Sequence, residues 1–275
     1  MPKSVALATK HGKLSQIGPW IEALDGWTVE LAEIDTDQFG TFSGEIAREK
    51  SPRDTAIAKA RTAADLLGSD YGLASEGTIG AHPAYPWINS DHEILALVRR
   101  TDDFVLTEIF LSPEIQAHSD EVDENTDLEA VVAKLDLPAH AAIIVAVGDV
   151  EIVLHKGVHD ANDFKQKIAE ALSTGTKLLR VENDFRAMHS PSRQANISKC
   201  AELLATRIKT KCAACGEIGF GKVGYEYGLP CSDCDQLVLS VANSERHACV
   251  SCEHSELRTL GQTSVDPSRC DFCNP

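Results

Sequence analysis

Eight of the nine cysteines of this chain form four Cys-x-x-Cys pairs near one end of the sequence. The pairs are Cys212/Cys215, Cys231/Cys234, Cys249/Cys252 and Cys270/Cys273, and Cys200 stands alone. Fifteen residues separate the first two pairs and seventeen the last two, which is typical of zinc ribbons. Two tight turns then supply the four thiolates of one tetrahedral ion. We therefore predict two structural zinc ions held by consecutive pairs, with an interleaved pairing as the alternative.

Disulfides and redox-active thiols are the other interpretations of these pairs. Disulfides are typical of oxidising compartments. The opening residues MPKSVALATKHGK are too short and too polar for a signal peptide, so we expect a cytoplasmic chain. Four redox pairs so close together would be unusual, and zinc is the favoured interpretation. Because apolar residues are sparse here, bound metal should supply much of the folding free energy.

Polar side chains with phosphate-binding character lie near the start of the chain. Thr9, His11 and Lys13 supply a hydroxyl, an imidazole and an ammonium group where a predicted strand passes into a predicted helix. Backbone N–H groups at such a helix start attract phosphate. An ordinary surface turn is the alternative.

Four carboxylates in the same part of the chain could bind a metal or move a proton. Glu76 ends a predicted strand, at the kind of sheet edge where ligands bind, and Asp54 lies in the first turn of a predicted helix. Asp91 and Glu93 share one face of a strand, whereas His92 points to the other face. Turn, helix-capping and edge positions are the corresponding structural interpretations.

The order of three short motifs resembles a known superfamily. A T-x3-K motif starts at Thr9, a D-x-A-x-x-K-A motif starts at Asp54, and a D-Y-x4-E-G motif starts at Asp70. Together they resemble the inosine/xanthosine triphosphate pyrophosphatase superfamily of house-cleaning nucleotide hydrolases, over roughly residues 5–80. The base-pocket signature Phe-Gly-Tyr-Asp-Pro of that superfamily is absent, so the resemblance implies no base specificity.

The resemblance implies a role for individual residues. It would place Lys13 on a triphosphate and Asp54 and Glu76 on Mg²⁺, with Thr9 nearby. Lys59 matches the lysine or arginine of the superfamily's helix motif, and Arg193 resembles its late phosphate-binding arginine.

The remaining charges fit the same chemistry. Asp91 or Glu93 could serve as the base, and Lys13, Arg186 and Arg193 would offset phosphate charge. Arg186 and Arg193 could equally be ordinary ion-pair partners. The segment 35–48 is either a lid over the substrate or a surface loop.

The full chain also resembles an uncharacterised bacterial family, a domain of unknown function. The segments that carry this resemblance are DTDQFGTFSGEI, LASEGTIGAHP, DHEI, NDFRAMHSPSR and CDFCNP. It implies no activity.

Hydrophobic periodicity predicts the elements that position these residues. We expect an α/β domain over 1–209, with a mixed, mostly parallel sheet and helices on both faces, followed by two four-cysteine zinc ribbons over 211–275. Ser51, Pro52 and Asp54 have the pattern of a helix start. The segments 93–98 and 104–110 are expected to form a hairpin.

Charge and hydropathy limit the partners. The formal net charge is −16, and residues 211–275 hold five Lys or Arg against nine Asp or Glu, so a nucleic-acid partner is disfavoured. The longest apolar run, Ala141–Val147, is far too short to cross a membrane.

We predict a Mg²⁺-dependent hydrolase of nucleotide phosphoanhydrides. The alternative is a non-catalytic nucleotide- or metabolite-binding scaffold that engages a protein partner through its zinc ribbons.

Overall fold

A computed structural model describes residues 2–9, 12–35 and 50–275 of the chain. The chain divides into two compact units, Met1–Leu204 and Ala205–Pro275. In the part of the chain that the structure describes, no helix is long and apolar enough to cross a bilayer.

The first unit contains a mixed five-stranded sheet in the order β2-β1-β3-β4-β5. Its strands are β1 (Lys3–Ala8), β2 (Trp27–Ala32), β3 (Tyr71–Ala81), β4 (Asn89–Arg99) and β5 (Val105–Ser112). β1 runs parallel to β2 and β3, whereas the β3–β4 and β4–β5 pairs are antiparallel.

The prediction of a mostly parallel sheet is therefore wrong. A parallel pair needs a crossover of a dozen or more residues, and the links 82–88 and 100–104 are too short for one. The expected hairpin is confirmed as the β4–β5 pair.

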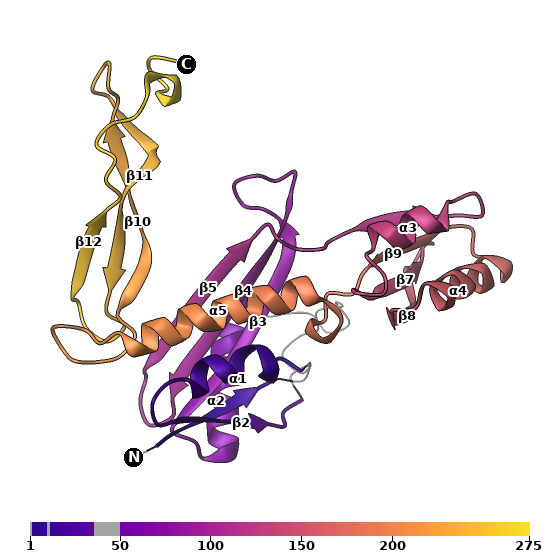
Figure 1. Cartoon of the computed structure of the whole chain (residues 1–275), viewed down its shortest axis with the longest axis horizontal. Coiled ribbons are helices and arrows are strands. Elements are labelled where there is room, and N and C mark those ends of the chain that lie inside the picture. The colour runs from indigo at the N-terminus through magenta and orange to yellow at the C-terminus, as the bar shows by residue number, and fades with distance from the viewer. Residues whose placement is uncertain (1, 10–11, 36–49) are drawn as a thin grey trace. The chain divides into compact units, whose positions relative to one another are not determined.

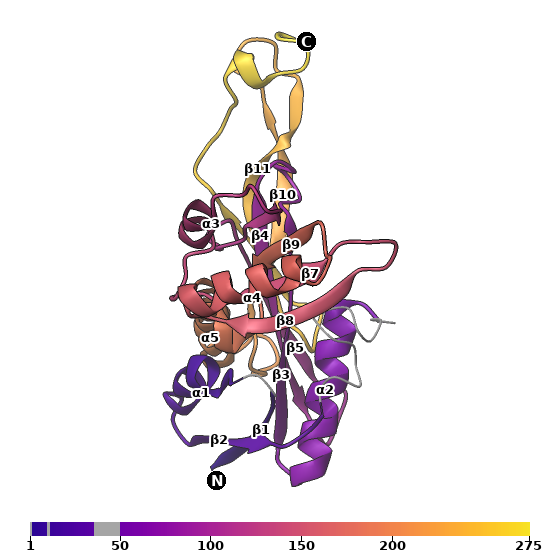
Figure 2. The same ribbon diagram turned by 90° about the vertical axis from the view of Figure 1, so that its right-hand side faces the viewer.

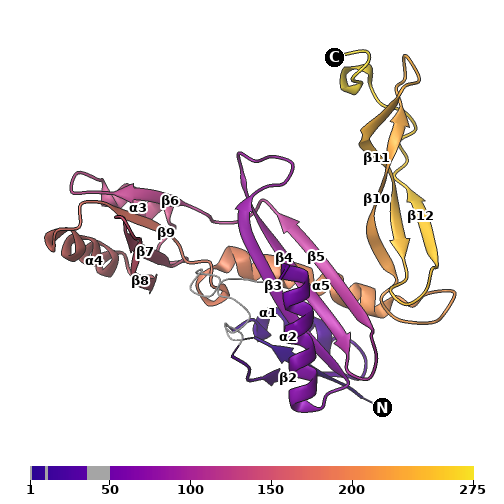
Figure 3. The ribbon, with the colours of Figure 1, turned by 180° about the vertical axis from the view of Figure 1, so that it is seen from behind.

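Helices lie on both faces of this sheet (Figure 2). α2 (Pro52–Leu67) covers one face, whereas α1 (Leu14–Glu22) and α5 (Pro191–Lys209) lie on the other. Figure 3 shows α2 running along β3 and β4. A Cβ atom on Gly72 would lie 1.8 Å from the Ala60 carbonyl oxygen, so only glycine permits this close packing of α2 on β3.

The start of α2 follows from its sequence. The Ser51 side chain accepts a hydrogen bond from the Asp54 N–H at 3.1 Å, and Pro52 occupies the first helical position. This confirms the predicted helix start.

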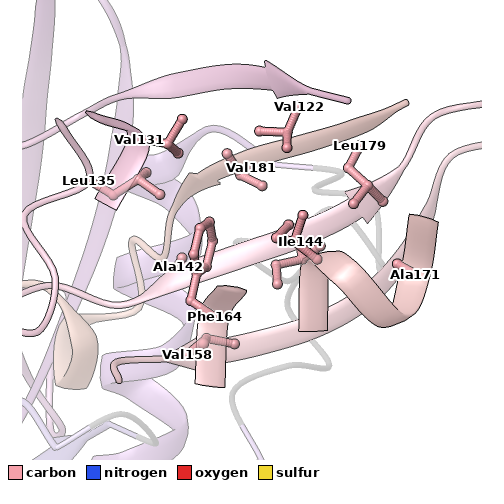
Figure 4. Close-up of a cluster of buried hydrophobic side chains, with 11 residues drawn as sticks. Val122, Val131, Leu135, Ala142, Ile144, Val158, Phe164, Ala171, Leu179 and Val181 are labelled. Carbon is pink, nitrogen blue, oxygen red and sulfur yellow. The ribbon is translucent and has the colours of Figure 1, made fainter. Parts of the chain in front are cut away.

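A second sheet in the first unit has its own core. The strands β6 (Ser119–Val122), β7 (Ala142–Ala146), β8 (Ile152–Val158) and β9 (Leu179–Asn183) form an antiparallel sheet in the order β6-β9-β7-β8. Side chains from α3 (Leu128–Lys134) and α4 (Ala161–Ser173) pack against it around the fully buried Phe164 (Figure 4). The α/β pattern of the sequence predicted a single sheet in this unit, and that prediction is wrong because the strands divide between two sheets.

The second unit is a three-stranded antiparallel sheet in the order β10-β11-β12 (Figure 1). Its strands are β10 (Gly221–Pro230), β11 (Leu237–Ala248) and β12 (Ser255–Thr259). One cysteine pair precedes β10, one lies in each of the two links between the strands, and one follows β12. The small core of this unit contains Cys231 and Cys270 beside Leu229, Val238, Val241 and Val265.

Candidate functional site

The eight paired cysteines form two clusters, and the pairing is interleaved. Cys212 and Cys215 lie with Cys249 and Cys252, while Cys231 and Cys234 lie with Cys270 and Cys273. The prediction that consecutive pairs share a metal is therefore wrong, and the interleaved alternative is correct.

The length of β10 explains this pairing. β10 has ten residues, which span about 33 Å as a strand, and it separates the first cysteine pair from the second. Because Gly221 pairs with Ala248 across the β10–β11 hairpin, the pair before β10 meets the pair after β11. β12 then runs antiparallel to β11, and Val265 pairs with Cys231 beside the second cluster.

The sulfur geometry of both clusters suits a tetrahedral metal. In each cluster two pairs of sulfurs, each joining one Cys-x-x-Cys pair to the other, lie 3.6 to 3.8 Å apart, and all four sulfurs lie within 4.8 Å of one another. Metal–sulfur bonds of about 2.3 Å at tetrahedral angles give about 3.8 Å. Both clusters could therefore hold a metal ion, which is compatible with two structural zinc ions.

Backbone N–H groups stabilise the thiolate form of one cysteine in each cluster. The N–H groups of Cys215 and Ala214 lower the pKa of Cys212 to about 6. Those of Asp233 and Cys234 lower the pKa of Cys231 to about 7. Thiolates are the metal-binding form of cysteine, so these turns favour ligation at neutral pH.

A second candidate site is a cluster of buried charges where β1 ends in the first unit. Its ionisable members are at most 8% exposed, and they are Lys13, Lys59, Glu76, Asp91, Glu93 and Arg193. β1 pairs with β3 only as far as Ala8 and Ala74, so β3 extends beyond it. The carboxyl end of a parallel strand at such a position is a common ligand site in α/β sheets.

Lys13 is the cation of this cluster without a direct ion pair among the described residues, since Lys59 pairs with Glu76 and Arg193 with Glu93. Its Nζ atom donates to the neutral Ser75 hydroxyl at 2.8 Å. Burial, and to a smaller extent the nearby charge of Arg193, lower the pKa of Lys13 to about 8, against the opposing effect of Glu93 and Glu76. A buried ammonium group with one neutral partner can accept an anion.

Asp91 and Glu93 form a buried carboxylate pair on one face of β4, as predicted from their spacing. Both residues are fully buried. Asp91 Oδ1 and Glu93 Oε2 have no hydrogen-bond partner among the described residues. Burial, and to a smaller extent the negative charge of Glu93, raise the pKa of Asp91 to about 7. Two such oxygens can accept a cation or share a proton.

The other charges of the cluster form two ion pairs, one on each face of the sheet. Lys59 of α2 forms a buried ion pair with Glu76. On the opposite face, Arg193 of α5 donates to Glu93 Oε1 at 2.6 Å. A Cβ atom on Gly77 would lie 2.4 Å from both Arg193 Nη2 and Glu93 Oε1, so a larger residue here would displace the ends of both paired side chains.

Some predicted site residues lie elsewhere. The side chain of Asp54 is 59% exposed and accepts a hydrogen bond from the Ser51 hydroxyl at 2.7 Å. Arg186 forms an ion pair with Asp184 next to the second sheet. Thr9, in contrast, directly follows β1, at the strand end where the charge cluster lies, and its buried hydroxyl has no partner among the described residues. His11 and most of the segment 35–48 lie outside the described residues.

The structure adds Ser75 and Asn196 to the site. Asn196 donates to Asp91 Oδ2 and to the Glu114 carbonyl oxygen, both at 3.0 Å. Its spacing of three residues from Arg193 places both on one face of a helix, and this signal could have identified it. No comparable signal marks Ser75 as the partner of Lys13.

Comparison with known families places most of the chain in one group. Residues 59–275 match the family described as "Domain of unknown function (DUF6671)". The chain belongs to this family. The matched region of this DUF6671 protein includes both cysteine clusters and every member of the charge cluster except Lys13. No curated protein and no solved structure matches the chain, and the resemblance to the inosine/xanthosine triphosphate pyrophosphatases gains no support from these comparisons.

Proposed function

We propose that this protein is a Mg²⁺-dependent hydrolase of nucleotide phosphoanhydrides whose site lies at the end of β1. The observation that carries the proposal is the combination of Lys13, a buried cation with a neutral partner, and a carboxylate pair with two unpartnered oxygens among the described residues. A phosphate group complements the first, and a divalent cation complements the second.

The carboxylates revise the expected metal ligands. Asp91 and Glu93 replace Asp54 and Glu76 in this proposal. Asp54 is exposed and Glu76 is paired with Lys59, whereas Asp91 and Glu93 each keep one oxygen without a partner among the described residues. Mg²⁺ is held by one or two carboxylates together with substrate phosphates. When bound, it neutralises phosphate charge and lowers the pKa of water.

The chain's own residues orient the substrate. Lys13 binds a phosphate oxygen, with the Ser75 hydroxyl fixing the position of its ammonium group. Arg193 and Asn196 hold Glu93 and Asp91 in place from α5. Asp91, beside the proposed ion, is the carboxylate that would accept a proton from the attacking water.

The test is hydrolysis of a panel of nucleoside triphosphates by the purified full-length chain with Mg²⁺, with phosphate and pyrophosphate both measured. Lys13→Met and Glu93→Gln should each reduce the rate by about 100-fold or more. Asp103→Asn is the matched control, because this carboxylate is fully exposed. No hydrolysis of any nucleotide, or full activity in both site variants, would contradict the proposal.

Glu76 is already paired with Lys59, and Arg193 with Glu93. These ion pairs favour a second candidate, a nucleotide- or metabolite-binding scaffold without turnover. Charged groups that are already ion-paired with each other fix the geometry of the site, but they are not free to react with a substrate. A nucleotide that raises the melting temperature of the first unit, lost in Lys13→Met and unaccompanied by hydrolysis, would support this candidate over the first.

For the two cysteine clusters we propose zinc. Four sulfur ligands leave no open coordination position, and zinc is the usual ion of such closed four-cysteine sites. Metal analysis of the purified protein should give two zinc ions per chain.

A further inference from the structure

Three polar residues that the proposed function does not use form a hydrogen-bonded chain in the first unit. His140 Nδ1 lies 2.8 Å from Asp136 Oδ2, and His140 Nε2 lies 3.0 Å from Ser192 Oγ. An imidazole between a carboxylate and a hydroxyl in this order is the arrangement that activates a serine nucleophile.

Separate elements hold the three residues in place. Asp136 and His140 follow α3, where the His140 N–H donates to the Asp136 carbonyl oxygen at 3.0 Å. The His140 side chain is only 7% exposed, so packing fixes the plane of its ring. Ser192 lies in the first turn of α5 and is partly exposed, as a residue that attacks a substrate must be.

The polarity of these hydrogen bonds suits proton transfer. The carboxylate of Asp136 favours the tautomer with the proton on Nδ1, which leaves the Nε2 lone pair facing the Ser192 hydroxyl. The Gln116 N–H also donates to Ser192 Oγ, at 3.1 Å. This donor fixes the position of Ser192 Oγ, and the positive end of the 19-residue α5 stabilises negative charge near Ser192.

We propose that Ser192, His140 and Asp136 form a nucleophilic triad that cleaves carboxylic esters. Ser192 Oγ forms a bond to the carbonyl carbon while its proton moves to His140 Nε2. The ester C–O bond then breaks, and the alcohol leaves with that proton. Water attacks the acyl-serine and gives a proton to His140, which returns it to Ser192 as the carboxylic acid departs. Asp136 acts as a positioning residue.

A fluorophosphonate probe tests the nucleophile directly in the full-length, metal-loaded chain. Its phosphorus should bond to Ser192 with loss of fluoride, and peptide mass spectrometry should locate the adduct. The same protein should hydrolyse p-nitrophenyl acetate, and both reactions should be lost in Ser192→Ala. Ser198→Ala is the matched control, since Ser198 lies on the same helix but pairs with Trp20.

Two further variants separate chemistry from folding. His140→Gln keeps hydrogen-bonding atoms at this position but no base, and it should lower the labelling rate about 100-fold in protein whose melting temperature shows that it is folded. Asp136→Asn suits the left-handed backbone at this position, where φ is 57°, and should slow labelling at least 10-fold. Absence of an adduct on Ser192, or equal labelling of folded His140→Gln, would overturn the proposal. These outcomes are independent of nucleotide hydrolysis.

Discussion

Gly77 shows how one missing side chain makes room for a buried ion pair. The Arg193–Glu93 pair occupies the space that a Cβ atom at this position would need. Gly77→Ala should therefore lower the free energy of unfolding by about 1–3 kcal/mol, because neither charged group can move away without losing its partner. Denaturation followed by tryptophan fluorescence measures this loss, since Trp20, Trp27 and Trp87 all lie in the first unit.

Gly80→Ala is the control for this measurement. Gly80 lies on the same strand, and a Cβ atom there would meet nothing within 4 Å. Equal stability of the two variants would show that the close approach at Gly77 carries no energetic cost.

Asp91 makes the stability of the first unit depend on pH. Its pKa rises from 3.8 to about 7 on folding, so between these values the folded state binds more protons than the unfolded state. This contribution is fully present below about pH 4 and is lost as the pH rises towards 7. In Mg²⁺-free buffer, Asp91→Asn should therefore flatten the fall in unfolding free energy between pH 5 and pH 7. A slope identical to that of the unaltered protein would contradict the raised pKa.

Lys13 makes the stability of the first unit depend on pH in a different, more alkaline range. Its pKa falls from 10.5 to about 8 on folding, so the unfolded state binds more protons between these values. Stability should rise with pH from about 8 to about 10, and Lys13→Met should remove this rise. Denaturant titrations across this range, again followed by tryptophan fluorescence, measure it.

At the scale of elements, the β10–β11 hairpin determines which cysteines lie in the same cluster. Because the hairpin joins the first and third pairs at one end, Cys212→Ser and Cys249→Ser should disturb the same ion. With ¹¹³Cd in place of the native metal, each variant should shift or lose the same one of two NMR signals. Cys231→Ser should affect the other signal. Loss of different signals in Cys212→Ser and Cys249→Ser would restore the consecutive pairing.

At the scale of the whole molecule, the two units depend on different sources of stability. The first has two sheets with apolar cores, whereas the core of the second includes cysteines of a cluster that could hold a metal ion. Removal of metal by a chelator should therefore unfold the second unit, because metal binding and folding are coupled in small cysteine-rich modules. Hydrogen exchange followed by mass spectrometry should become faster across β10, β11 and β12 and stay unchanged across β1 to β5.

The sequence alone determined the features that depend on neighbouring residues. The cysteine spacing identified all eight candidate ligands, the Ser51–Asp54 pattern identified a helix start, and the alternation along β4 placed Asp91 and Glu93 on one face. Each of these signals spans only a few residues, and local geometry is sufficient to interpret it.

Only the tertiary structure decided which distant residues meet. It interleaved the cysteine pairs because the long strands β10 and β11 bring the first pair to the third. It also made β3 and β4 antiparallel, because the link 82–88 is too short for a parallel crossover. It also left Asp54 at an exposed helix start while bringing Ser75 to Lys13 and Asn196 to Asp91. Such contacts depend on strand order and helix placement, and these follow from packing across the whole sheet rather than from any short segment.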